Sequence, residues 1–233
     1  MAIELKSDDG KIKTILDYYI LTNKLKDVIR TGWKRWGVKR KRVESVAEHI
    51  YGTCMLAVAI WSETLPNVNI SEVILMLALH ETEENIVGDI TPYDDEKKLA
   101  LKKSGEKAVL AIFKDLIAKD VYFKLVHDFN TKATPEAIFA HKCDKLECDI
   151  QARLYSDEGC LKLEYADEIK EDERIKNLIS NNVNDVADFF IITDRKHYPD
   201  DDIFNKISRY IEKRQIKKQS KTVSKKSKKQ EEE

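Results

Sequence analysis

The stretch of sequence that decides the fold lies at residues 73–89 and reads VILMLALHETEENIVGD. Its first seven residues are apolar on every side of a helix, which is typical of a helix buried in a protein core. One histidine, three glutamates and one aspartate follow. Charged groups at the end of a buried helix are normally paired with one another or bound to a metal. The stretch therefore predicts a helical protein with a polar or metal-binding centre next to its core.

Helical geometry assigns different positions to these polar side chains. Residues four apart share one face of a helix, so Glu84 is expected one turn beyond His80. Glu81 is expected about 100° around the helix from His80, which lets both side chains reach one ion. Glu83 is expected to face solvent. Asp89 follows a glycine, whose conformational freedom permits a turn that brings Asp89 back toward the same cleft.

Two further segments supply candidate ligands. His49 stands in the first turn of a helix that should begin near Ser45, and Asp144 stands within a helix that is otherwise apolar on one side. Two histidines and two carboxylates form a mixed nitrogen and oxygen set, which suits divalent transition metals such as Mn, Fe, Co, Ni or Zn. The chain has five histidines and no second pair near His80, so we expect one ion.

The composition favours an all-α fold. The 233 residues include only 7 Gly and 4 Pro, and 36% of them are charged. A hydrophobic content of 42% is enough for a core, and no run alternates long enough to predict a sheet. Apolar spacing and capping residues predict helices over 11–29, 45–65, 69–87, 95–117, 121–129, 134–155, 173–180, 183–192 and 201–215. Between them we expect a loose lead at 1–10, a basic aromatic loop at 33–42 after a closing Gly32, and a loop at 88–94.

The charge is distributed unevenly along the chain. The formal net charge is −1, but the last twenty residues carry eight Lys or Arg against three Glu, which leaves −6 for the rest. Those residues contain too few apolar side chains to form a core. We therefore predict one domain at 1–213 and a disordered, Lys-rich tail at 214–233. An acidic body argues against a nucleic-acid-binding fold, so any nucleic-acid contact is expected from the tail alone.

The four cysteines do not form a disulfide framework or a Cys-x-x-Cys pair, which favours reduced thiols in a cytoplasmic protein. The first residues lack the apolar segment of a signal peptide. No stretch approaches the roughly 18 uncharged residues that span a bilayer. We therefore expect a cytoplasmic protein without a membrane partner.

The ordered polar residues resemble those of the HD-domain metal-dependent phosphohydrolases, and within them most resemble the bacterial 5′-deoxynucleotidases and their eukaryotic HD-domain relatives. The similar segments occur in the same order and are Gly32-Trp33, Glu44–His49, His80–Asp89 and Asp144-Lys145. The resemblance extends over roughly residues 12–160. It implies an all-α HD-domain helical bundle, and a homodimer, because such proteins often pair.

The resemblance also implies roles for individual residues. It identifies three groups: the metal ligands His49, His80, Glu81 and Asp144, the catalytic carboxylates Glu84 and Asp89, and Trp33 at the substrate pocket. Two positions depart from the family pattern. The acid of the His-Asp pair is here a glutamate, one methylene longer, and Gly32 stands where the deoxynucleotidases carry an arginine. We expect the basic groups that hold the phosphate to be Lys34, Arg35 and Lys145.

The predicted reaction is metal-assisted hydrolysis of a nucleotide phosphoester, most specifically of a (deoxy)nucleoside 5′-monophosphate. No serine or cysteine is placed as a nucleophile beside a base, and there is no Gly-rich phosphate loop. Two alternatives within the family are a (deoxy)nucleoside triphosphohydrolase and a degenerate domain that binds a nucleotide without hydrolysing it. An alternative of another class is a helical interaction or nucleic-acid-binding protein that uses the basic tail.

Overall fold

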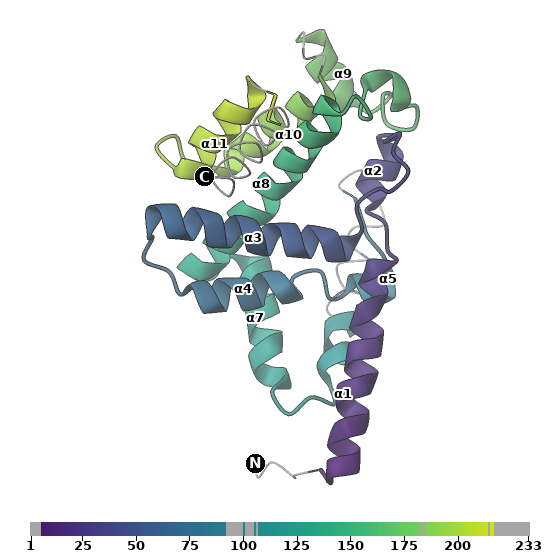
Figure 1. Cartoon of the computed structure of the whole chain (residues 1–233), viewed down its shortest axis with the longest axis vertical. Coiled ribbons are helices and arrows are strands. Elements are labelled where there is room, and N and C mark those ends of the chain that lie inside the picture. The colour runs from purple at the N-terminus through teal and green to yellow at the C-terminus, as the bar shows by residue number, and fades with distance from the viewer. Residues whose placement is uncertain are drawn as a thin grey trace, which may run out of the picture. The chain divides into compact units, whose positions relative to one another are not determined.

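The computed structural model describes residues 6–91, 100, 105, 107–181, 183, 185–213 and 215–216 (Figure 1). The chain divides into two compact units, of which the first comprises Met1–Gly32 and Glu44–Cys143 and the second comprises Trp33–Val43 and Asp144–Glu233. Several predictions lie wholly or partly outside the described residues: the lead at 1–10, the loop at 88–94, the helix at 95–117 and the disordered tail at 214–233.

The first unit is built from helices. Its elements are α1 (Asp8–Thr22), η1 (Asn23–Lys26), α3 (Val46–Thr64), α4 (Ile70–Leu79), α5 (Glu84–Val87) and α7 (Lys119–Thr131), and residues 107–113 are also helical. α4 lies beside α3 and also contacts α7 (Figure 1). The apolar residues that α4 buries are Val73, Met76, Leu77 and Leu79. This helix therefore supplies the core, as its composition predicts.

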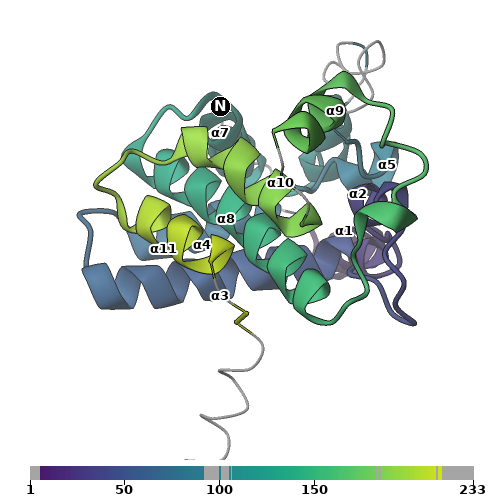
Figure 2. The ribbon, with the colours of Figure 1, turned by 90° about the horizontal axis from the view of Figure 1, so that it is seen from above.

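Two helices cross from the first unit into the second, α2 (Thr31–Arg35) and α8 (Pro135–Asp157). The remaining elements of the second unit are η2 (Leu163–Tyr165), α9 (Glu173–Ser180), α10 (Val186–Asp194), η3 (Arg195–His197) and α11 (Ile203–Glu212). α10 and α11 run side by side in Figures 1 and 2.

Aromatic rings fill the core of the second unit. Trp33 and Trp36 are each only 1% exposed, and both rings pack against Phe190 at centroid distances of 5.2 and 5.4 Å. Gly37 follows with φ +64°, and a Cβ placed on it would lie 2.0 Å from the carbonyl oxygen of Tyr165. Only glycine fits there, both because of its backbone conformation and because of this close approach.

The all-α fold is confirmed. Every named element in the described part of the chain is a helix, and extended backbone pairs there only in an isolated antiparallel bridge between Ile29 and Ser45. Among these helices, none combines the length and the apolar character that crossing a bilayer requires.

The helix predicted over 69–87 is wrong in its second half. α4 ends at Leu79, a turn follows, and α5 begins only at Glu84. The backbone N–H and the hydroxyl of Thr82 both donate to the carbonyl oxygen of Leu79, at 3.0 and 2.6 Å. In a continuing α-helix that oxygen would accept from the amide four residues on, so the threonine replaces a helical bond with a local one.

The helix predicted over 11–29 is wrong at both ends. α1 already begins at Asp8, because the Ser7 side chain accepts from a backbone N–H of the first turn. It ends at Thr22 and passes into η1. Beyond η1, the backbone N–H of Arg30 donates to the carbonyl oxygen of Glu44 at 3.0 Å. This tertiary bond holds the segment in an extended conformation that the local pattern does not reveal.

Gly32 does not end a helix. It lies inside α2, and its φ is not positive, whereas Gly37, Gly88 and Gly159 do have positive φ. The start of the predicted basic loop at 33–42 is therefore helical as far as Arg35.

Candidate metal centre

The first turn of α3 positions His49. Ser45 Oγ accepts from the backbone N–H of Glu48 (3.3 Å), and Glu48 Oε2 accepts from the backbone N–H of Ser45 (2.9 Å). This reciprocal capping box satisfies two backbone donors that would otherwise lack partners. His49 follows within the same turn and is wholly buried.

The end of α4 positions His80 and sets its tautomer. The side chain is buried, and its Nδ1 lies 2.7 Å from the carbonyl oxygen of Leu77. A carbonyl oxygen can only accept, so Nδ1 carries the hydrogen, and in the neutral ring Nε2 carries the lone pair. A backbone partner of this kind is typical of a histidine that presents its other nitrogen to a metal.

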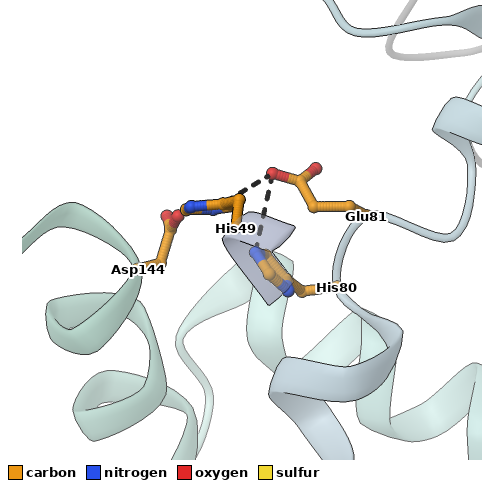
Figure 3. A group of neighbouring side chains, drawn as sticks. All are labelled: His49, His80, Glu81 and Asp144. Carbon is orange, nitrogen blue, oxygen red and sulfur yellow. Dashed lines mark ion pairs between the residues drawn. The ribbon is translucent and has the colours of Figure 1, made fainter. Parts of the chain in front are cut away.

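The structure brings four of the predicted residues together. One ligand atom from each of His49, His80, Glu81 and Asp144 lies within 4.8 Å of the others (Figure 3). Glu81 Oε1 is 3.5 Å from His80 Nε2 and 3.9 Å from His49 Nε2. Asp144 lies in α8.

The donor set fits a divalent metal ion. Two imidazoles and two carboxylates supply the nitrogen and oxygen ligands that transition metals accept. Three of the four side chains are buried, and Glu81 is half-buried. Two carboxylates brought this close to each other repel unless positive charge lies between them. The metal-ligand role of each residue stays a prediction.

Glu84 lies near the carboxylates of both Glu81 and Asp89. Burial, followed by the charges of Glu81 and Asp89, raises the pKa of Glu84 far above its usual range, and Arg30 opposes that shift. Asp89 accepts a hydrogen bond from the backbone N–H of Thr31, and its carbonyl oxygen accepts from the Thr31 hydroxyl at 3.0 Å. Gly88 has φ +75°, so the turn expected there does occur.

The expectation that Glu83 faces solvent is wrong. Its side chain is half-buried, and burial together with the charge of Glu81 raises its pKa to about 7. Its Cγ lies 3.6 Å from the position that a Cβ on Gly105 would occupy. The prediction fails because it assumes a continuous helix through a segment that is a turn.

The residues predicted to bind substrate occupy different environments. Lys145 Nζ lies 3.2 Å from Asp144 Oδ2, and this carboxylate is the main reason that the lysine pKa is raised. Lys34 is exposed and Arg35 is half-buried. Trp33 is buried in the aromatic core of the second unit, where its ring packs edge-on against Tyr155. A substrate-binding role stays a prediction for all four.

Arg30 is a site residue that the sequence prediction missed. Its Nη1 lies 3.6 Å from Glu81 Oε1, and its side chain is only 15% exposed. The sequence offered one signal for it. The family pattern has an arginine at the position of Gly32, and Arg30 lies two residues before that position. Arg30 places a permanent positive charge beside Glu81 and Glu84.

The chain is similar to several known proteins. The human 5′-deoxynucleotidase HDDC2 is 30% identical over 148 residues, which cover 62% of this chain and 70% of that protein. The zebrafish (Danio rerio) 5′-deoxynucleotidase HDDC2 is 32% identical over 146 residues, which cover 61% and 70%. A solved structure from Magnetospirillum magnetotacticum, described as a predicted metal-dependent phosphohydrolase, has a TM-score of 0.57 at 19% identity, covers 83% of this chain and 97% of its own, and shows the shared fold.

A family model supplies the assignment. The model of the HD domain matches residues 22–186, a span that includes all four residues of the cluster. That span is well over half of the 233 residues. This chain therefore belongs to the HD domain family.

Proposed function

We propose that this protein is a metal-dependent 5′-deoxynucleotidase, which hydrolyses the phosphate ester of a deoxynucleoside 5′-monophosphate. The observation that carries the proposal is the cluster of His49, His80, Glu81 and Asp144, whose ligand atoms lie within 4.8 Å of one another. The 5′-deoxynucleotidases to which the chain is similar support the choice of substrate.

In this proposal the four clustered side chains hold one divalent transition metal ion, of Mn, Co, Ni, Fe or Zn. Such an ion, when bound, neutralises charge on the phosphate and lowers the pKa of a water molecule. Glu84 and Asp89 then move protons between the water and the leaving oxygen. Burial, followed by the charge of Glu81, raises the pKa of Glu84, which favours the protonated carboxyl that a proton donor needs.

Positive side chains hold the phosphate. We propose Arg30 for this role because its guanidinium lies at the cluster. A guanidinium fork matches two phosphate oxygens at once. The basic residues predicted from the sequence that remain candidates are Lys34, Arg35 and Lys145.

We further propose that the enzyme works in the cytoplasm. All four cysteines are free thiols, which is usual in a reducing compartment such as the cytoplasm. We propose a homodimer with a nucleotide as its only required ligand besides the metal, and a Lys-rich tail at 214–233 that follows a domain at 1–213.

The test is a metal and substrate screen on the purified full chain. Metal-free protein is reloaded separately with Mn, Co, Ni and Mg, and the release of phosphate, pyrophosphate or triphosphate from nucleotides is measured. We expect phosphate from deoxynucleoside 5′-monophosphates with a transition metal. His80→Ala should lower both the metal affinity and the rate of phosphate release by more than about 100-fold. Even residues that only hydrogen-bond to a metal ligand typically contribute about 10- to 100-fold to metal affinity or activity.

The matched control is His127→Ala, which removes an exposed histidine on α7 and should change neither quantity. Release of triphosphate from nucleoside triphosphates would identify a triphosphohydrolase instead. A protein that binds metal and nucleotide without turnover would be a binding domain. The ion pair between Arg30 and Glu81 is the observation that favours this second candidate, because it engages the oxygen expected to ligate the ion.

A further inference from the structure

Helix α1 carries apolar side chains on two opposite faces. One face holds Tyr18, whose ring lies 6.2 Å from that of Phe113. Thr14 is on the same face and accepts a hydrogen bond from Lys6 Nζ at 2.6 Å, while Lys6 also donates to the carbonyl oxygen of Asp115. This inner face therefore packs on the helical segment around residues 107–116.

The opposite face of α1 is apolar and exposed. Its side chains recur at the spacing of three and four that defines one side of a helix. They are Ile12 (55% exposed), Ile15 (61%), Leu16 (51%), Tyr19 (59%) and Ile20 (61%). We call these five residues the α1 stripe. Exposed apolar residues scattered singly are ordinary, but a continuous stripe of five large ones marks an interaction surface.

The protein's own core gives α1 little support. None of the fifteen residues of α1 is buried. A helix of this length is marginal by itself in water, because most helical stability comes from packing an apolar face. A partner on the α1 stripe would supply the packing that the described part of the chain does not.

We propose that the α1 stripe binds the α1 stripe of a second copy of this chain, antiparallel and about a two-fold axis at Leu16. This assigns an interface to the proposed homodimer and does not depend on the nucleotidase activity.

The charges at the ends of the stripe favour this occupant. Asp8 and Asp9 precede the stripe, and Lys24 and Lys26 follow it; all four are exposed. Leu16 lies eight residues from Asp8 and eight from Lys24, which is about 12 Å in each direction at the helical rise. An antiparallel pair centred on Leu16 therefore places the acidic end of each helix beside the basic end of the other. A self-complementary surface of this kind is what a two-fold interface requires.

The area of the stripe also fits a dimer. Five large side chains that are each more than half exposed form an apolar patch on the order of a few hundred Å² per protomer. A standard interface buries about 800 Å² per partner, of which somewhat more than half is apolar. The stripe thus supplies the apolar part, and the flanking charged residues supply the rim.

A membrane surface is a less suitable occupant. Helices that lie in a bilayer interface carry Lys and Arg on the polar face. α1 carries three aspartates, Asp8, Asp9 and Asp17, against the two lysines Lys11 and Lys13. Anionic lipid headgroups would not be attracted to this helix.

Cysteine cross-linking in the full-length chain tests the geometry. At the two-fold axis the two copies of residue 16 face each other, so Leu16→Cys should give a disulfide-linked dimer under mild oxidation. Ile12→Cys should not, because the two copies of residue 12 would lie about 12 Å apart along the helices, beyond disulfide reach. Adding Ile20→Cys to Ile12→Cys should restore cross-linking. Wild-type protein, with its four native thiols, measures the background.

Three outcomes would overturn the assigned interface. Equal cross-linking of Leu16→Cys and Ile12→Cys indicates a parallel or non-specific contact. A dimer in sedimentation equilibrium that none of these variants cross-links indicates another interface, and a wild-type chain that sediments at 27.0 kDa at all concentrations rules out the dimer itself. None of these results bears on phosphate release, so the proposed activity is judged separately.

Charge exchange provides a second, independent measurement. Asp8→Lys combined with Asp9→Lys should raise the dissociation constant of the dimer at least 10-fold at low salt, because both ends of the helix are then basic and repel each other. Adding Lys24→Asp and Lys26→Asp should restore it, which a folding defect would not do. The matched control is Val58→Glu, which changes an exposed aliphatic residue on α3. It should leave the molecular mass of the assembly in solution unchanged. Failure of the fourfold variant to recover would contradict the antiparallel pairing.

Discussion

Glu81 is the residue through which the groups of the metal centre are connected. Its Oε1 lies within 4 Å of His49 Nε2, His80 Nε2 and Arg30 Nη1. Burial first, and the charge of this carboxylate second, raise the pKa of Glu84 and of its neighbour Glu83. The family pattern has an aspartate here, whereas this chain carries the glutamate side chain, which is one methylene longer.

The first prediction concerns the length of this side chain. Glu81→Asp should lower metal affinity by about 10- to 100-fold and lower the rate of phosphate release with it, because the shorter side chain withdraws its oxygen from the histidines. Isothermal titration calorimetry with the metal ion measures the metal affinity. Glu63→Asp, the same change at an exposed position of α3, should have no effect. A gain in affinity or rate would mean that the longer acid is a handicap.

At the scale of single elements, helix ends decide where the site residues lie. The capping box of α3 fixes the turn that carries His49, and the Thr82 bonds to Leu79 end α4 directly before the acidic segment. A metal site needs ligand side chains whose positions are fixed by rigid secondary-structure elements. The ends of two helices and the middle of α8 meet that need here.

The second prediction tests the α3 cap. Ser45→Ala should lower the free energy of unfolding by about 1 kcal/mol, because a backbone N–H at the helix start loses its acceptor. Urea denaturation followed by circular dichroism gives the change. Ser62→Ala makes the same substitution at an exposed position late in the same helix, and its effect should stay within about 0.5 kcal/mol. Equal effects of the two would show that the cap is not contributing.

For the whole molecule, the near balance of 41 basic and 42 acidic residues means that net charge does little to set the pH dependence of stability. Individual buried groups then dominate. Asp149 is wholly buried, and the Tyr198 hydroxyl donates to its Oδ2 at 3.2 Å. Burial, and next the charge of Asp194, raises the pKa of Asp149 well above its usual range, while Tyr198, Lys145 and Arg195 oppose the shift.

The third prediction follows from the sign of that shift. Above about pH 4 the unfolded chain loses the Asp149 proton and the folded chain keeps it, so this residue lowers stability progressively as the pH rises toward its folded pKa. Asp149→Asn removes the titration and keeps an acceptor for Tyr198. It should raise Tm at pH 7 by at least about 2–4 °C and match the wild type near pH 4.

Thermal unfolding measured between pH 4 and pH 8 checks this difference. The control is Asp200→Asn, at a side chain that is 94% exposed, and its unfolding curve should follow the wild type at every pH. A variant at Asp149 whose Tm difference from the wild type does not change with pH would contradict the assignment.

Comparing prediction with structure shows where local pattern is sufficient. The helix predicted over 45–65 is found as α3 (Val46–Thr64), and the one over 134–155 as α8 (Pro135–Asp157). Both have strong start signals and long apolar periodicity. The end of α4 was missed because Thr82 competes for a carbonyl that periodicity assigns to the helix. That error then misplaced Glu83.

What the sequence by itself determined is the helical class, because helical periodicity is a property of residue types and their spacing. The four residues of the cluster are those that the resemblance to the HD-domain phosphohydrolases implies. Their role as ligands stays a prediction, although the fold brings their atoms within 4.8 Å. Only the tertiary structure decided that Arg30 reaches Glu81 and that Trp33 is buried. It alone decided which apolar face of α1 is covered. Burial and charge neighbours depend on contacts between residues that are far apart in the sequence, and a local sequence pattern carries no information about such contacts.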